Sequence, residues 1–255
     1  MKIGIIGVGI IGTAIATGFC ESHDENLKLI LSPRGRERAQ ALKEKYPEQV
    51  EIAASNQEVV DRAEWVFLAV LPEQAEPLIQ ELTFRPEQKF INLVATLGVE
   101  RARAIIGELS VIADVVPLPF NARHIGPIIL YPPIREVQEL LSQLGTVVSV
   151  NTPEQMAVLR STTALMSPYY ELLASVTDWC TEQGLEEKQA RSYLTSFFGA
   201  LSVIASGWED GLHQLAGEMT PGGLNWQALK GLEEQGNFTQ WKEILDPVLK
   251  RVIKK

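Results

Sequence analysis

The first part of the chain alternates short apolar runs with segments of helical periodicity. Continuous apolar runs are typical of strands covered on both faces of a parallel sheet. They predict strands over residues 2–6, 27–31, 50–53, 65–70, 90–95, 111–116, 127–131 and 146–150. Polar segments of helical spacing lie between them, for example over residues 37–46 and 57–62. This order predicts a doubly wound α/β domain of the Rossmann type over residues 1–150.

The pattern changes after residue 150. Thr152-Pro153-Glu154-Gln155 is a capping box with proline at the first helical position, and no strand pattern follows it. We expect a long helical stretch over residues 155–182, broken or kinked near Pro168. Further helices are predicted over residues 185–206, 208–216, 225–235 and 238–254. The sequence thus predicts a second, all-α domain over residues 151–255.

The helical domain carries more apolar residues than so thin a layer is expected to bury. Leu194, Phe197, Phe198, Leu201 and Ile204 recur at helical spacing. A surface of this kind is typically covered by another subunit. We therefore expect a homodimer, or a higher oligomer of dimers, built on the helical domain.

A glycine motif follows the first predicted strand. Gly7, Gly9 and Gly12 fall at G-x-G-x-x-G spacing, and Ile10 and Ile11 lie at the start of the following helix. In a strand–turn–helix context, these glycines permit a tight turn, close approach of a diphosphate, and close packing of helix on strand. The helix N-terminus adds unpaired N–H groups and a partial positive charge. The motif predicts a dinucleotide site.

The segment after the second strand bears on the choice of cofactor. An NAD site would place Asp or Glu there, but the chain has Ser32, Arg34 and Arg36. A hydroxyl and guanidinium groups would hold a 2′-phosphate by charge-assisted hydrogen bonds. We expect NADP(H), bound by Ser32 and Arg34. For Arg36, the start of a solvated helix is an equally good interpretation.

Composition excludes several function classes. The 255 residues have a net charge of −9 and a pI near 5.0, which disfavours nucleic acid and anionic membranes as partners. No long apolar stretch free of glycine and charge predicts a membrane span, and the three histidines are scattered, so no metal site is expected. Cys20 and Cys180 form no C-x-x-C pair, and no export signal is evident. We expect a cytoplasmic protein with reduced thiols.

Together these motifs resemble the pyrroline-5-carboxylate reductase family over nearly the whole length. The matching segments are IGVGIIGTAIATGF near the start, SNQE at 55–58, FLAVLPEQ at 67–74, EMTPGGLN at 218–225 and GLEEQGNF at 231–238. The resemblance implies a Rossmann domain, an all-helical dimerisation domain and NADPH-dependent reduction of a cyclic imine acid to proline. The resemblance, together with the expected position at the carboxyl edge of the sheet, assigns further residues to the cofactor site: Asn56, Ala69, Val70, Leu71, Pro72 and Ala95.

Several departures surround the substrate side of the resemblance. The segments 116–121 and 163–170 differ from the family's M-P-N-T-P and S-G-S-G-P-A-Y motifs. Leu71 stands where the family has lysine, and Asn225 replaces the threonine that faces the imine. The sequence therefore leaves the substrate open between pyrroline-5-carboxylate and a related imine.

The loop before residue 225 predicts the substrate site. Gly222 and Gly223 free the backbone to point N–H groups at a carboxylate. We predict substrate contacts from Pro221, Gly222, Gly223, Leu224 and Asn225. The Asn225 amide, predicted as the catalytic group, is able to donate to a carboxylate or accept from an iminium N–H. It is also a good N-cap, and that interpretation stays open.

Other interpretations also remain. Arg123 and His124 lie in the altered loop and are secondary candidates for a proton donor, as are Tyr169 and Tyr170. The chain is alternatively an NADP-dependent dehydrogenase of another small carboxylated substrate, although Lys188, the only lysine between residues 155 and 229, lies in an acidic, exposed segment. A third possibility is a non-catalytic NADPH-binding protein.

Overall fold

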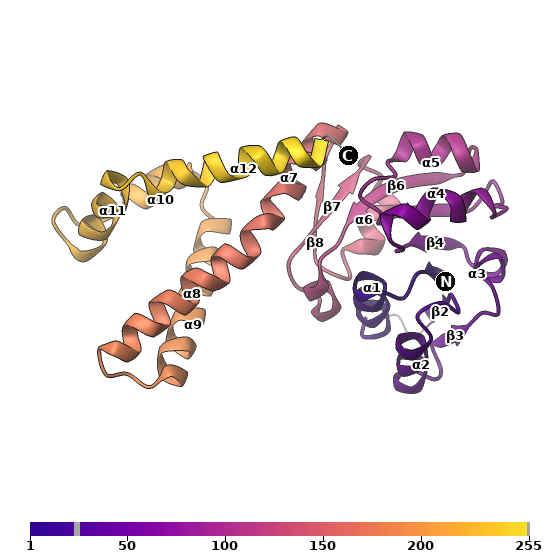
Figure 1. The fold of residues 1–255 in the computed structure, drawn as a ribbon, viewed down its shortest axis with the longest axis horizontal. Helices are drawn as coiled ribbons and strands as arrows, with labels where there is room; N and C mark the ends of the chain where they lie inside the picture. Colours follow the sequence, from indigo (N-terminus) through magenta and orange to yellow (C-terminus); the bar gives the residue numbers. More distant parts are fainter. Residues whose placement is uncertain (23–25, 254–255) are drawn as a thin grey trace. The chain divides into compact units, whose positions relative to one another are not determined.

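The computed structural model describes residues 1–22 and 26–253, which divide into two compact units. The first unit runs from Met1 to Arg160, and the second begins at Ser161. Figure 1 shows the elements of both units.

The first unit alternates strands and helices, as predicted. Its strands are β1 Lys2–Ile6, β2 Lys28–Leu31, β3 Val50–Ile52, β4 Trp65–Leu68, β5 Lys89–Asn92, β6 Val111–Val116, β7 Pro127–Tyr131 and β8 Thr146–Ser149. Its helices are α1 Ile10–Cys20, α2 Arg36–Lys45, α3 Asn56–Arg62, α4 Pro72–Gln80, α5 Val99–Ile106, α6 Arg135–Leu141 and α7 Pro153–Thr162, with a 3₁₀ turn, η1, at Pro119–Arg123.

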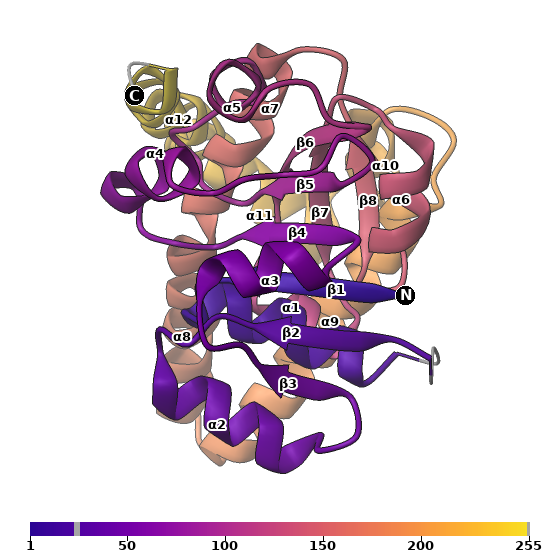
Figure 2. The ribbon, with the colours of Figure 1, turned by 90° about the vertical axis from the view of Figure 1, so that its right-hand side faces the viewer.

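The strands form one sheet in the order β3-β2-β1-β4-β5-β6-β7-β8 (Figure 2). Every neighbouring pair is parallel except β6 and β7, which are antiparallel. This exception has a local cause, because the segment between β6 and β7 holds only the short turn η1 and no crossover helix. The chain order reverses between β1 and β4, so the carboxyl ends of these strands flank a topological switch point.

Helices cover both faces of the sheet, which gives the unit two apolar cores. On one face Ile3, Ile5 and Phe67 pack with residues of α1, α2 and α6. On the other face Ile6 and Val66 pack with residues of α3, α4 and α5. The predicted doubly wound α/β architecture is confirmed.

The first unit extends past the boundary expected at residue 150. Helix α7 packs on the sheet through Met156, which is buried against Ile129 and Val150. Near its end, the Arg160 Nη1 donates a 2.9 Å hydrogen bond to the Ala95 carbonyl. These contacts explain why the division falls after Arg160.

The second unit is helical throughout its described residues. It contains the 3₁₀ turn η2 Thr163–Leu165, then α8 Met166–Glu182, α9 Glu187–Ser206, α10 Leu212–Gly217, α11 Leu224–Glu234 and α12 Asn237–Ile253. The predicted break in the long helix lies at η2, and Pro168 sits in the first turn of α8, where its missing N–H costs no helical hydrogen bond. No helix in the described chain is long and apolar enough to span a membrane.

Candidate functional site: a pocket at the switch point of the sheet

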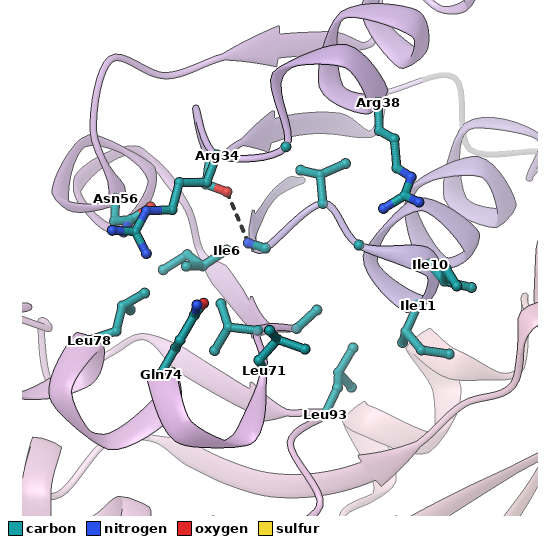
Figure 3. Close-up of a pocket in the computed structure, with 17 residues that line it drawn as sticks. Ile6, Ile10, Ile11, Arg34, Arg38, Asn56, Leu71, Gln74, Leu78 and Leu93 are labelled. Atoms are coloured by element: carbon teal, nitrogen blue, oxygen red, sulfur yellow. Dashed lines mark hydrogen bonds between the residues drawn. The ribbon is translucent and has the colours of Figure 1, made fainter.

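The first unit has a pocket of about 510 Å³ at the carboxyl edge of the sheet. It lies over the ends of β1, β2 and β4, the place where doubly wound sheets bind ligands. Figure 3 shows its walls, which α1, α2 and α4 complete. The lining residues are Ile6–Ile11, Ser32, Arg34, Gly35, Arg38, Asn56, Ala69–Leu71, Gln74, Leu78 and Leu93.

The glycine motif forms one wall of this pocket, and each glycine has a distinct reason to be there. Gly7 has φ +99°, and a Cβ there would lie 2.5 Å from the Ala69 carbonyl oxygen. A Cβ at Gly12 would overlap the Gly7 carbonyl oxygen, so Gly12 lies behind the loop, where helix meets strand. Gly9 faces open space, with no atom within 4 Å of a Cβ built there. The loop is therefore shaped for close approach of a ligand at Gly9.

Ser32 fixes the glycine loop. Its hydroxyl oxygen accepts a 2.9 Å hydrogen bond from the Gly7 N–H, and the residue is almost fully buried at the end of β2. The hydroxyl proton is still available to a ligand. Ser32 thus holds the loop in shape as well as lining the pocket.

Two arginines bring positive charge to the pocket from different places. Arg34 lies in the loop after β2, and its side chain extends toward Asn56 (Figure 3). Arg38 lies in α2 and extends toward the start of α1, where Ile10 and Ile11 are (Figure 3). Arg36, for which the sequence left function and solvation open, is exposed and does not line the pocket. Arg38 was not predicted.

Asn56 lies opposite Arg34 at the start of α3. The preceding Ser55 caps the helix, accepting a 3.1 Å hydrogen bond from the Glu58 N–H. The Asn56 side-chain oxygen is buried and has no hydrogen-bond partner within the described chain. A buried acceptor without a partner is costly, so this oxygen is suited to a donor that arrives with a ligand.

A second cavity, of about 250 Å³, adjoins this polar end. Arg34 and Asn56 line it together with Glu73 of α4 and Glu81, the residue that follows α4. The two carboxylates would repel a phosphate. Anion binding at this end therefore depends on the Arg34 guanidinium.

The opposite end of the pocket is apolar. Ile10, Ile11, Val70, Leu71 and Leu93 line it, and Ile10 and Leu71 are exposed. The pocket thus offers charge and hydrogen bonds at Arg34 and Asn56, a second guanidinium near the start of α1, and an apolar surface at Leu71 and Leu93.

Most of the predicted cofactor residues are brought together in this pocket. The exceptions are Gly12, Pro72 and Ala95, which do not line it. Pro72 is the first residue of α4, and Ala95 lies in the loop beyond Leu93. Their contact with a cofactor stays a prediction.

Sequence reasoning missed several lining residues, among them Arg38, Gln74, Leu78 and Leu93. Gln74 and Leu78 lie four residues apart on α4, so they share one helix face. The sequence alone could therefore have placed Gln74 and Leu78 on the same face of the helix. The position of Leu93 depends on how the loop after β5 turns, which no local pattern reveals.

The predicted substrate loop lies in the second unit and forms a tight turn. The Gly223 N–H donates a 3.0 Å hydrogen bond to the Thr220 carbonyl, with Pro221 and Gly222 between them. Gly222 has φ +74°, as the third position of a type II turn requires. The Gly223 N–H, predicted to face an anion, is therefore used within the turn.

Asn225 does not cap the helix that follows. The N-cap of α11 is Gly223, so Leu224 and Asn225 occupy the first turn. Both residues are exposed. The backbone N–H groups of this first turn lie beyond the reach of intrahelical acceptors, which leaves them available to a ligand.

His124, a secondary candidate, lies away from the pocket walls. Its Nε2 is 2.9 Å from the Gly18 carbonyl oxygen of α1, and its backbone is left-handed at φ +59°. It does not line the pocket. The structure thus gives His124 a contact that holds the loop against α1.

Asp114 of β6 is a buried carboxylate beneath the loop after β5. Its two oxygens accept hydrogen bonds from the Asn92 side chain at 2.8 Å and from the Val99 N–H at 3.0 Å. Burial raises the pKa of the carboxyl to about 6, because desolvation outweighs these two hydrogen bonds. Asp114 anchors the start of α5.

Among the described residues no cluster of metal-ligating side chains occurs.

Comparison with known proteins agrees with this fold. Residues 2–97 match the family model described as NADP oxidoreductase coenzyme F420-dependent. A pyrroline-5-carboxylate reductase of Corynebacterium melassecola is 23% identical in an alignment that covers 92% of this chain and 91% of that protein.

Solved structures give the same picture at low identity. The 1-pyrroline-5-carboxylate reductase of Streptococcus pyogenes aligns with a TM-score of 0.83 at 20% identity, covering 100% of this chain and 99% of that one. The pyrroline carboxylate reductase of Plasmodium falciparum, solved with NADP bound, aligns with a TM-score of 0.81 at 16% identity, covering 99% and 97%. The predicted resemblance is confirmed.

Proposed function

Because the chain is a distant relative of the pyrroline-5-carboxylate reductases, we propose that it is an NADPH-dependent reductase of a cyclic imine acid. The substrate is pyrroline-5-carboxylate, reduced to proline, or a closely related imine. We place the enzyme in the cytoplasm as a homodimer or an oligomer of dimers.

One observation carries the cofactor assignment. The polar end of the pocket presents Arg34 and Asn56, and the residues that line the pocket in the described part of the chain include no Asp or Glu. NAD sites place a carboxylate at this end to accept from the ribose hydroxyls. A guanidinium instead favours a 2′-phosphate. The buried Asn56 oxygen without a partner fits a ribose hydroxyl as its donor.

The remaining walls fit the other parts of the same cofactor. The open approach at Gly9 and the start of α1 suit a diphosphate. The apolar end at Leu71 and Leu93 suits an uncharged ring. When bound, the nicotinamide supplies the hydride, and the chain's task is to orient the ring and hold the substrate beside it.

The substrate carboxylate is proposed to bind at the turn before α11. With the Gly223 N–H engaged by Thr220, the available donors are the first-turn N–H groups of α11 and the Asn225 amide. An amide also accepts from an iminium N–H, which would favour the protonated imine. Arg123 and His124 are not required in this arrangement.

The cofactor assignment is tested by titrating the protein with NADPH and NADH. NADPH should bind at least about tenfold more tightly, roughly 1.4 kcal/mol. Arg34→Ala should remove most of that preference, because Glu73 and Glu81 then remain without a counter-charge near the phosphate. Equal affinities in the wild type would contradict the assignment.

The reaction is tested with a panel of cyclic imines and oxo acids, followed at the nicotinamide absorbance band. Oxidation of NADPH with pyrroline-5-carboxylate or a related cyclic imine supports the reductase. Turnover only with oxo or hydroxy acids would favour a dehydrogenase. Binding of NADPH without turnover across the panel would favour a non-catalytic protein.

A further inference from the structure

Two arginines line the pocket, whereas the prediction from the sequence assigned only one arginine, Arg34, to the cofactor site. Arg34 and Arg38 both line the pocket, but Figure 3 shows them extending to different parts of it. Arg34 extends to Asn56 and Arg38 extends to the start of α1. We propose that each arginine binds a different anionic group of one cofactor: Arg38 binds the diphosphate, and Arg34 binds the 2′-phosphate. This inference rests on the proposed NADPH site.

A guanidinium would add to the charge with which the glycine loop and the start of α1 hold a diphosphate. The N-cap of α1, Gly9, has no side-chain cap, and the first turn of α1 has no acidic residue. A helix N-terminus supplies about half an elementary charge. A bound diphosphate has two negative charges, so a guanidinium across the loop would complete the neutralisation.

The backbone brings Arg38 to the loop through Gly35. Gly35 is the N-cap of α2 and has φ +78°. A Cβ there would lie 3.0 Å from the Val8 carbonyl oxygen, so the glycine lets α2 approach the glycine loop closely. Ala39 and Leu42 are buried in the core beneath α2 and fix its orientation. Arg38 thus projects from a rigid element.

The charge on Arg38 is not engaged by a carboxylate within the described part of the chain. Arg62 and Arg101, by contrast, form ion pairs with glutamates. A surface arginine left without an acidic partner beside a binding loop is available to an anionic ligand.

The test compares the binding of three ligands to Arg38→Ala. NADPH and NADH both contain the diphosphate, whereas 2′-AMP has a 2′-phosphate and no diphosphate. Arg38→Ala should weaken NADPH and NADH by the same factor, roughly 10- to 100-fold, and leave 2′-AMP unchanged. Arg38→Lys should fall between wild type and alanine.

Two matched variants make the comparison sharp. Arg36→Ala removes the same charge from α2, two residues away and outside the pocket, and should change none of the three affinities. Arg34→Ala should weaken NADPH and 2′-AMP and spare NADH.

The division of roles would be overturned by a loss for NADPH alone in Arg38→Ala, a loss for 2′-AMP in that variant, or an equal loss in Arg36→Ala. Unchanged NADPH and NADH affinities in Arg38→Ala would overturn it as well. Failure of the proposed NADPH site is separate, because wild-type protein would then bind neither dinucleotide. Failure of the proposed reductase activity is separate as well, because it shows as binding of NADPH without turnover of any imine.

Discussion

The two units differ in how much apolar surface each buries by itself. In the first, the sheet is covered on both faces, and Phe19, Phe67 and Phe90 are fully buried. In the second, the only buried apolar residues among those described are Ala190 and Leu194, while Tyr193 and Val203 are about 70% exposed. The first unit therefore carries its own core, and the second has an apolar surface that a further protein surface must cover.

We take that further surface to be a second copy of the chain. Helices α8 and α9 pack on each other, for example through Tyr169 against Phe198 at 6.2 Å between ring centroids. Between them lies a groove of about 400 Å³, rimmed by Asp178, Glu187 and Arg191. Of these residues, Glu187 and Arg191 form an ion pair with each other within α9.

The largest expected effect comes from breaking the core of the first unit. Phe67→Ala removes a fully buried ring that packs edge-on against Phe19 at 5.8 Å between centroids. It should lower the free energy of unfolding by about 3–5 kcal/mol, independent of protein concentration. Phe197→Ala, at a 45% exposed ring of α9, is the comparison. This ring contacts Tyr193 and Phe198 of its own helix, and its exposed part is free for the proposed second copy to cover. The effect of this change in urea denaturation should therefore vary with protein concentration.

The next effect is on assembly. Ile204→Glu places a charge on the exposed apolar surface of α9 and should weaken self-association at least about a hundredfold, roughly 2.7 kcal/mol. Light scattering at micromolar concentration measures the change. Ile125→Glu is the matched control, since Ile125 is exposed to a similar degree, 54% against 58%, but lies in the first unit. A wild-type monomer, or equal effects of both changes, would contradict the proposed dimer.

A smaller effect is expected at the substrate turn. Asn225→Ala should lower kcat/KM for the imine by roughly 1.5–3 kcal/mol, the cost of one lost hydrogen bond to a charged group. The affinity for NADPH should stay nearly unchanged, because the proposed cofactor pocket lies in the first unit. Unfolding should also be little affected, since the side chain is exposed.

Two neighbouring changes extend the test of the turn. Gly223→Val adds a Cβ about 3.0 Å from the Thr220 carbonyl oxygen and should raise KM or abolish turnover by distorting the turn. Asn225→Thr restores the family's residue and should be tolerated if pyrroline-5-carboxylate is the substrate. Wild-type rates in both Asn225→Ala and Gly223→Val would place the substrate elsewhere.

The smallest effect is the pH dependence of the first unit. Because burial raises the pKa of Asp114 from 3.8 to about 6, its contribution to stability is full below the unfolded value and falls as pH rises through about 6. Wild type should lose about 1 kcal/mol more than Asp114→Asn between about pH 5 and about pH 8. Urea denaturation at the two pH values checks this, and parallel profiles would refute it.

Local sequence determined the elements of the first unit and the outline of its site. Apolar runs marked every strand of the sheet, because strands covered on both faces have no polar side. The spacing of Gly7, Gly9 and Gly12 located the loop, because the backbone requires glycine at Gly7 and Gly12 and Gly9 leaves space for a ligand. Most of the cofactor residues expected from these patterns line one pocket.

Only the tertiary structure decided how distant segments meet. Arg38 joins the pocket because Gly35 lets α2 approach Val8, and no pattern within α2 distinguishes Arg38 from Arg36. Met156 attaches α7 to the first unit through a contact with Ile129, far away in sequence. Periodicity identifies which face of a helix is apolar, but the surface that covers that face is set by packing, which is a property of the whole fold.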